Sequence, residues 1–167
     1  KRENQRFLPG VTLSDNLHPS GDLESVVTGK DLVLVVTPSH VTRRTIERCG
    51  HAIGPDTVVV SASKGIENQT HLTMSGVLAE VIPGLSADRL TVLTGPSFAK
   101  EVGRQMATVV TVASSDTNSA EVVQQVFVTP YFRVYTIDDV IGAELGAAVK
   151  NVIAIAAGVI DGLGLGL

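Results

Sequence analysis

Short apolar runs recur through the middle of the chain and predict five strands. The runs are rich in β-branched residues and occupy residues 32–36, 58–60, 90–93, 108–112 and 132–135. Between them, apolar residues return at helical spacing over residues 41–51, 72–81, 98–102 and 119–127. Continuous apolar strands that alternate with helices are typical of a mostly parallel sheet covered on both faces. The alternation weakens toward the end, so the last two strands are expected to be later additions or antiparallel.

The last long apolar stretch, residues 140–160, is expected to be a helix of a packed core. It is long enough to cross a membrane. However, Glu144, Lys150 and Asn151 lie inside it, and ionisable residues are costly within a bilayer. We therefore expect no membrane span.

Composition and charge narrow the class of protein. Of the 167 residues, 44% are hydrophobic and 18% are charged, which favours a folded core. The net charge of −4 and the lack of a basic stripe argue against nucleic acid as a partner. The single cysteine, Cys49, cannot form an intramolecular disulfide and fits a cytoplasmic protein. The four histidines lack metal-ligand spacing, so no metal site is expected.

The segment before the first strand is polar and broken by proline and glycine. A dinucleotide-binding sheet normally opens with a strand, a Gly-x-Gly-x-x-Gly turn and a helix. No such turn lies between a strand and a helix anywhere in the sequence. The chain therefore either begins after that unit or never had it.

Three motifs follow predicted strands, where ligands of open α/β sheets bind. In the first, Pro38 sets a turn and Ser39 is expected to cap the next helix, or the loop lies along a dinucleotide. In the second, Lys64 precedes a glycine and either approaches an anion or is a solvated turn lysine. In the third, Gly95 allows close backbone approach and Ser97 is expected to cap a helix whose free N–H groups suit a phosphate. A tight turn without a ligand is the alternative.

A fourth motif lies on the long helix. Lys150 projects from a face of glycine and alanine, where partial desolvation would lower its pKa and suit general acid–base chemistry. The alternative is a lysine that extends to solvent.

These blocks resemble one family. KGIE (64–67), GPSFAKEV (95–102), FRVY (132–135) and ELGAAVKNVIAIAAGVIDGLGLG (144–166) look like the signature blocks of NAD(P)-dependent glycerol-3-phosphate dehydrogenase, the bacterial type above all. RENQRFLPG near the start and VVTPSHVTRR are also similar to family segments. The blocks follow the family order and cover nearly the whole chain.

The resemblance implies an α/β fold: a truncated Rossmann-like, mostly parallel sheet followed by the start of an all-helical C-terminal domain. Residues 1–136 would be a dinucleotide-binding domain without its first strand–helix–strand unit, and residues 137–167 the first helix of the substrate domain. The family transfers a hydride between NAD(P)H and dihydroxyacetone phosphate to give sn-glycerol 3-phosphate, a glycerophospholipid precursor. An internal fragment of this kind is expected to be inactive alone.

The family's site residues carry over by position. The catalytic lysine falls on Lys150. The residues that bind the phosphorylated substrate are implied to be Lys64, Gly95, Ser97, Lys150 and Asn151. Contacts to the cofactor, NAD or NADP, are implied for Lys64, Ala99, Pro38 and Ser39. A homodimer is compatible with the resemblance, whereas the preference between NAD and NADP cannot be read.

Two other functions stay open at this point. One is a non-catalytic, truncated remnant that serves as an interaction module. The other is a related reductase that acts on ketopantoate or a β-hydroxyacid, which would not be expected to carry all of these blocks together.

Overall fold

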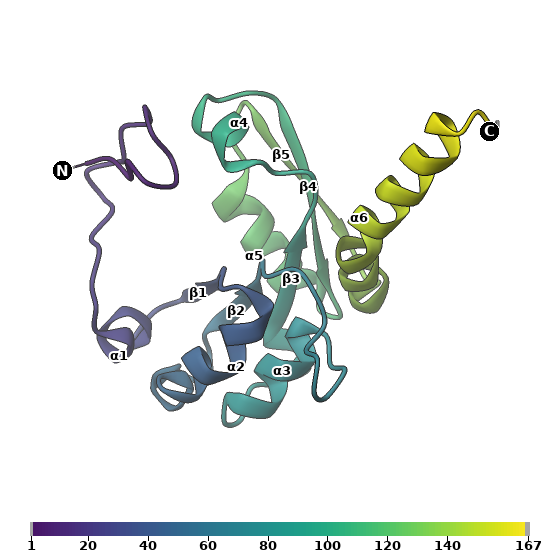
Figure 1. Ribbon diagram of the computed structural model, residues 1–167. Coiled ribbons are helices and arrows are strands. Elements are labelled where there is room, and N and C mark those ends of the chain that lie inside the picture. Colours follow the sequence, from purple (N-terminus) through teal and green to yellow (C-terminus); the bar gives the residue numbers. More distant parts are fainter. Residues whose placement is uncertain (1, 166–167) are drawn as a thin grey trace.

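The centre of the molecule is a five-stranded sheet whose strands lie in chain order (Figure 1). The structure is a computed structural model and describes residues 2–165. Lys1, Gly166 and Leu167, which belong to the ends of the two expected domains, lie outside the described residues. The strands are β1 (Leu32–Val35), β2 (Val58–Ser61), β3 (Leu90–Thr94), β4 (Thr108–Ser114) and β5 (Phe132–Ile137).

Three of the four strand pairs are parallel. β1, β2 and β3 run in one direction, β4 pairs antiparallel with β3, and β5 pairs parallel with β4. The mostly parallel sheet and the change of direction near its end are therefore confirmed. All four residues of β2 are buried, as expected for a central strand with helices on both faces.

Helices connect the strands and cover the sheet. They are α1 (Leu23–Val27), α2 (Ser39–Glu47), α3 (Met74–Val81), α4 (Ala99–Gly103), α5 (Thr117–Phe127) and α6 (Val140–Gly162), with short 3₁₀ turns at Gly50–Ala52 and Ala87–Arg89. α2 and α3 pack on one face of the sheet and α5 packs on the other. α6 starts against β3 and β4 and then extends away from the body (Figure 1).

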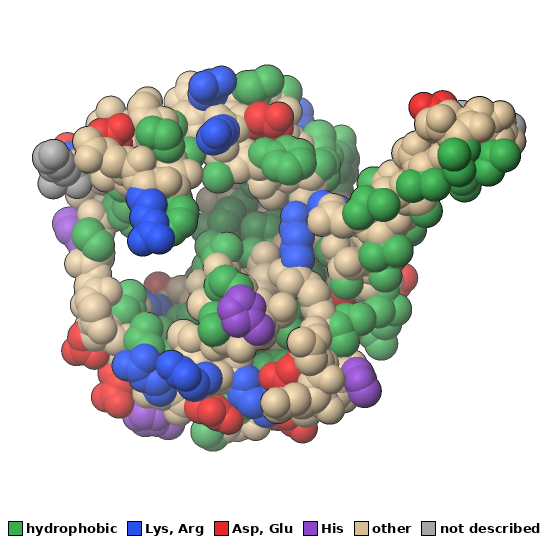
Figure 2. Space-filling model, viewed as in Figure 1, with side chains coloured by type: hydrophobic (Ala, Val, Ile, Leu, Met, Phe, Trp, Pro, Cys, Tyr) green, Lys and Arg blue, Asp and Glu red, His purple; other side chains and the backbone are tan. Residues whose placement is uncertain are grey.

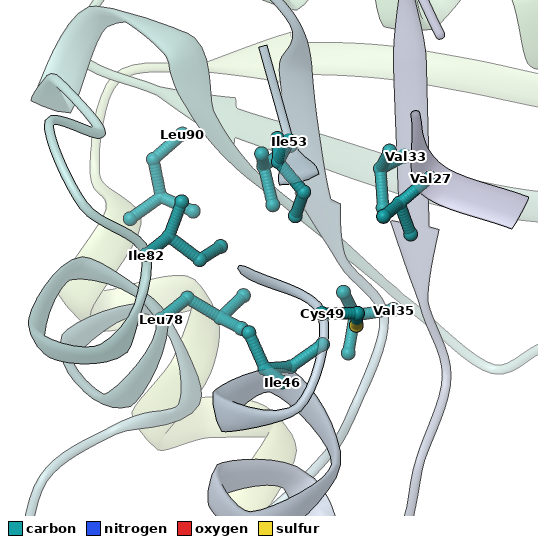
Figure 3. Packing of buried hydrophobic residues seen from close by; sticks show 10 residues of the cluster. Val27, Val33, Val35, Ile46, Cys49, Ile53, Leu78, Ile82 and Leu90 are labelled. Carbon is teal, nitrogen blue, oxygen red and sulfur yellow. The ribbon is translucent and has the colours of Figure 1, made fainter. Parts of the chain in front are cut away.

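The two faces of the sheet bury separate apolar clusters. The first joins β1 and β2 to α2 and α3, and Figure 3 shows Val35 beside Cys49 and Ile46 beside Leu78. The second lies under α5 and contains Val58, Val60, Val110, Val112, Ala120, Val123 and Val134. Successive residues of one strand enter opposite clusters, because strand side chains alternate between the two faces. The valine-rich strands therefore supply both cores.

Several local expectations were wrong. α1 was not expected; it forms because the carboxylate of Asp22 accepts from the backbone N–H groups of Glu24 and Ser25. Ser39 and Ser97 do not cap helices. The cap position of α2 is Pro38 and that of α4 is Phe98, and neither cap makes a side-chain hydrogen bond.

α6 is mostly uncovered. By length and composition it could cross a membrane, with a mean hydropathy of 1.6 over its most apolar window, of which 6% is buried. One such helix is only a weak indication of a membrane span, because the core helix of a soluble protein passes the same test. Of the residues in this helix, only Glu144 is buried.

Candidate active site

The carboxyl ends of β1, β2 and β3 lie next to one another, because the three strands are parallel neighbours. Pro38 and Ser39 follow β1, Lys64 follows β2, and Gly95 and Ser97 follow β3. The fold thus gathers three of the four motifs along one edge of the sheet. Figure 2 shows a hollow in the middle of this side of the molecule, with Lys and Arg side chains at its edge close to the base of the protruding helix.

Lys64 links two of these strand ends. Its ammonium Nζ donates a hydrogen bond to the carbonyl oxygen of Gly95 at 2.9 Å. Partial burial of the ammonium, followed by the nearby positive charge of Lys150, lowers the pKa of Lys64. The second and fourth motifs therefore lie near each other in the folded chain, since Gly95, which bonds to Lys64, lines the same hollow as Lys150.

Lys150 is one of the residues that line a hollow between α6 and the strands β3, β4 and β5. The hollow has a volume of about 330 Å³ and is lined by Thr94, Gly95, Pro96, Thr111, Ile137, Gly142, Ala143, Gly146, Ala147 and Lys150. Its lining carries no acidic side chain, and the glycines and alanines of α6 form one wall. A small anionic molecule would meet positive charge and little steric obstruction there.

The expectation that Lys150 is partly desolvated was wrong for this structure. Lys150 is exposed, and its Nζ donates to the side-chain oxygen of the adjacent Asn151 at 2.6 Å. The small residues around it leave open space that no other segment of residues 2–165 fills. Partial burial instead affects the ammonium of Lys64, which bonds to the carbonyl oxygen of Gly95 after β3.

The loop that carries Lys64 is held from two sides. Gly65 adopts a φ of +123°, and a Cβ at this position would lie 3.0 Å from Oγ of Ser39, at the start of α2. Two residues on, Glu67 accepts three hydrogen bonds from Arg43 of α2, at 2.8 to 3.1 Å. Arg43 also donates to Glu80 of α3 at 2.6 Å. The hydrogen bonds from Arg43 lower the pKa of Glu67, and the hydrogen bonds to Glu67 and Glu80 raise the pKa of Arg43.

The remaining predicted residues of the site lie on the turn after β3, at the start of α4 and at the start of α2. Gly95 is needed for packing in its own right, since a Cβ there would lie 2.9 Å from the backbone of Val109 and Val110. The backbone N–H of Ser97 donates to the carbonyl of Gly95 at 3.0 Å. Ala99 begins α4 and is exposed. Among residues 2–165, the side chains of Ser39 and Ser97 make no hydrogen bond.

Sequence reasoning missed the residue pair that attaches α6 to the sheet domain. Glu144 is 5% exposed and accepts from the backbone N–H of Ser75 at 2.8 Å and from its hydroxyl at 2.5 Å. Ser75 lies in the first turn of α3. A carboxylate inside an apolar helix could have indicated a buried polar contact, but Glu144 was used only as an argument against a membrane span.

The sequence predicted no metal site, because its four histidines lack metal-ligand spacing. All four histidines are exposed. Across the described residues, no group of three or more His, Cys, Asp or Glu side chains could hold a metal ion.

Comparison with known protein families gives two matches in consecutive parts of the chain. The family model of the NAD-dependent glycerol-3-phosphate dehydrogenase N-terminus matches residues 1–120. The model of the C-terminus of the same family matches residues 139–167. The first match alone covers more than half of the chain.

Individual relatives agree with the family models. The chain is 49% identical over 164 residues to the glycerol-3-phosphate dehydrogenase [NAD(P)+] of Syntrophotalea carbinolica, covering 98% of this chain and 49% of the relative. It is 50% identical over 165 residues to the same enzyme of Geobacter sulfurreducens, with 99% and 49% covered. The crystal structure of the Coxiella burnetii glycerol-3-phosphate dehydrogenase superposes with a TM-score of 0.86 at 32% identity, covering 99% of this chain and 50% of that one. The chain thus spans about half the length of these relatives.

Proposed function

The chain belongs to the NAD-dependent glycerol-3-phosphate dehydrogenase family, and from this premise we propose that its protein reduces dihydroxyacetone phosphate to sn-glycerol 3-phosphate with NADH or NADPH. The observation that carries the proposal is a hollow without acidic groups that is lined by both Lys150 and Gly95, the residue whose carbonyl oxygen accepts a hydrogen bond from Lys64. Two ammonium groups suit a substrate that carries both a phosphate and a carbonyl to be polarised.

The residues of this chain fit one end of the bound cofactor. The hollow includes the carboxyl end of β3, which lies beside β2 at the edge of the sheet where dinucleotides bind in open α/β folds. No glycine-rich turn between a strand and a helix occurs within residues 2–165, so the pyrophosphate would require other residues of the protein. When bound, the nicotinamide supplies the hydride for carbon 2 of the substrate. We assign Pro38, Ser39, Lys64 and Ala99 to the cofactor side of the site.

Lys150 is the proposed general acid and base. In the direction of reduction, its ammonium donates a proton to the carbonyl oxygen of the substrate as that oxygen gains negative charge. In the direction of oxidation, the neutral amine accepts the proton of the 2-hydroxyl group. Asn151 already bonds to Nζ of Lys150 and would orient it toward the hollow.

Lys64 and the turn after β3 are the proposed substrate-binding elements. Lys64 is fixed by its bond to the carbonyl of Gly95, so its charge is placed before the substrate arrives. Ser97 has an exposed side chain on the same turn and is free to bond to the phosphate or a hydroxyl of the substrate. Placement in advance matters because binding then costs less ordering of side chains.

The proposed division into domains follows the same logic. Residues 1–136 would bind the cofactor, and residues 137–167 would begin the helical domain that closes over the substrate. We further propose a cytoplasmic enzyme that forms a homodimer and has no nucleic-acid partner.

The test uses the protein produced from its full gene, assayed for oxidation of NADPH and of NADH with dihydroxyacetone phosphate. Lys150→Ala should lower kcat by about 10²- to 10⁴-fold, the usual contribution of a positioned acid or base. Lys64→Ala should lower kcat/KM by about 10- to 100-fold, as expected for the loss of a charged hydrogen bond. The matched control is Lys30→Ala, an exposed lysine just before the amino end of β1, which should leave both constants unchanged.

Three results would change the proposal. Activity that survives in Lys150→Ala would move the acid–base role to another residue, with Lys64 the next choice. A folded wild type that turns over ketopantoate or a β-hydroxyacid instead would favour a related reductase. A folded protein inactive with all of these substrates would favour a non-catalytic interaction module.

A further inference from the structure

Glu144 and Ser75 form the polar junction between α6 and the rest of the molecule. Within residues 2–165, the two hydrogen bonds from Ser75 to Glu144 are the only hydrogen bonds that join α6 to another helix or strand. Beyond this point the described part of α6 extends away from the body with most of its side chains exposed (Figure 1). Together with the packing of α6 against β3 and β4, this contact sets the direction and rotation of the helix where it leaves the sheet.

The chemistry of this contact gives it a fixed geometry. Both carboxylate oxygens of Glu144 are used, one by a backbone N–H and one by a hydroxyl of the same residue. Because both bonds go to Ser75, they fix the rotation of the Glu144 carboxylate as well as its distance from Ser75. The hydroxyl of Ser75 also lies 3.1 Å from that of Thr73, the residue that caps α3. A carboxylate at the first turn of a helix is further stabilised by the free N–H groups there.

Lys150 lies six residues after Glu144 on the same helix, and about 1.5 Å of rise per residue separates them by about 9 Å along its axis. A small tilt of α6 about Glu144 therefore displaces Lys150 by a distance that grows in proportion to the tilt and to this separation. Lys64 does not move with it, because its bond to Gly95 and the Arg43–Glu67 contact hold it on the sheet domain.

We propose that Glu144, through Ser75, is a positioning residue that sets the distance between Lys150 and Lys64 and so completes the active site. The inference rests on the function proposed above, in which these two lysines act on one substrate. A contact that served only to stabilise the fold would not need to affect the relation between the lysines.

The experiment combines kinetics with a measurement that does not need activity. In the full-length protein, Lys64 and Lys150 are acetylated with acetic anhydride over a range of pH, and each site is quantified by mass spectrometry. In the wild type, Lys64 should begin to react at a lower pH than an ordinary lysine, because partial burial and then the nearby charge of Lys150 lower its pKa. In Glu144→Ala this profile should shift to higher pH, since Lys150 moves away.

The kinetics of the same variants should follow. Glu144→Ala should lower kcat by up to about 100-fold, the effect of a misplacement near 1 Å, with KM for the cofactor nearly unchanged. Ser75→Ala removes one of the two bonds and should show a smaller loss. Glu144→Gln can still accept from the N–H of Ser75 and donate to its hydroxyl, so it should retain most of the activity and the wild-type labelling profile.

The control and the contrary outcomes separate the two proposals. Glu121→Ala removes an exposed carboxylate from α5, on the other face of the sheet, and should change nothing. If Glu144→Ala does not fold, Ser75→Ala carries the test. A folded Glu144→Ala or Ser75→Ala variant with the wild-type Lys64 profile overturns the positioning role, even if activity falls. An inactive wild type overturns the proposed function, while the labelling still reports on the junction.

Discussion

Gly65 is the residue on which the conformation of the Lys64 loop depends most directly. Its φ of +123° is one that side chains rarely adopt, and an added Cβ would also press on Oγ and Cβ of Ser39 at 3.0 and 3.2 Å. Gly65→Ala should therefore destabilise the full-length protein by about 1–3 kcal/mol. Urea unfolding measures this cost.

Two variants separate the sources of that cost. Gly21→Ala has open space around it and serves as the control. Adding Ser39→Gly to Gly65→Ala removes the contact but not the backbone strain, so stability should recover only in part. A Gly65→Ala protein as stable as Gly21→Ala would contradict the structure of this loop.

The ion pair between Arg43 and Glu67 makes a second prediction at the same scale. Its hydrogen bonds lower the pKa of Glu67 in the folded state. The resulting stability is present above the ordinary glutamate pKa of about 4.3 and is lost as pH falls through the lower, folded value. The wild type should therefore lose stability more steeply with acid than Glu67→Gln does.

Thermal unfolding of both proteins between neutral and acidic pH measures the difference in slope. Glu121→Gln, which removes an exposed carboxylate of α5, should keep the steep wild-type slope. Parallel curves for the wild type and Glu67→Gln would show that the pair does not form in solution.

At the scale of elements, strands were easier to predict than helix ends. The sheet strands follow from runs such as VVV in β2, because a strand buried on both faces must be apolar throughout. The start of a helix was harder to predict, because it depends on which polar side chain accepts a hydrogen bond from a free backbone N–H of the first turn. Ser39 and Ser97 had suitable chemistry, but Asp22, Thr73, Asp116 and Asp139 are the residues that cap helices. Local propensity cannot distinguish these cases, since the cap depends on the backbone path into the helix.

The candidate active site also has features that the sequence predicts and features that it does not. The motifs at strand ends could be placed from sequence, because parallel strands bring their carboxyl ends to one edge. The contacts between distant residues could not, including Lys64 with Gly95, Arg43 with Glu67 and Ser75 with Glu144. Each joins segments at least 24 positions apart, and one sequence carries no information on such pairing.

For the whole molecule, the decisive feature is the uncovered apolar surface of α6. Val152, Ile153 and Ile155 are 67%, 62% and 68% exposed. Exposed apolar patches of this kind drive association. The 167-residue polypeptide, prepared as such, should therefore self-associate or be partly molten, bind hydrophobic dyes and lack dehydrogenase activity. Sedimentation and amide NMR spectra test this, and sharp, dispersed signals from a monomer would contradict it.

Substitutions locate the surface responsible. Replacing Val152, Ile155 and Val159 with glutamine should reduce dye binding and shift the isolated polypeptide toward monomer, because all three side chains are exposed on α6. The matched control replaces Val122 and Val126, which are exposed on α5, with glutamine. It should have little effect, because α5 packs on the sheet and does not extend beyond the body as α6 does. In the full-length protein the α6 substitutions should instead lower stability, as these side chains would then lie against the remainder of the enzyme. Equal behaviour of the two sets in both proteins would mean that α6 is not the surface through which the chain associates.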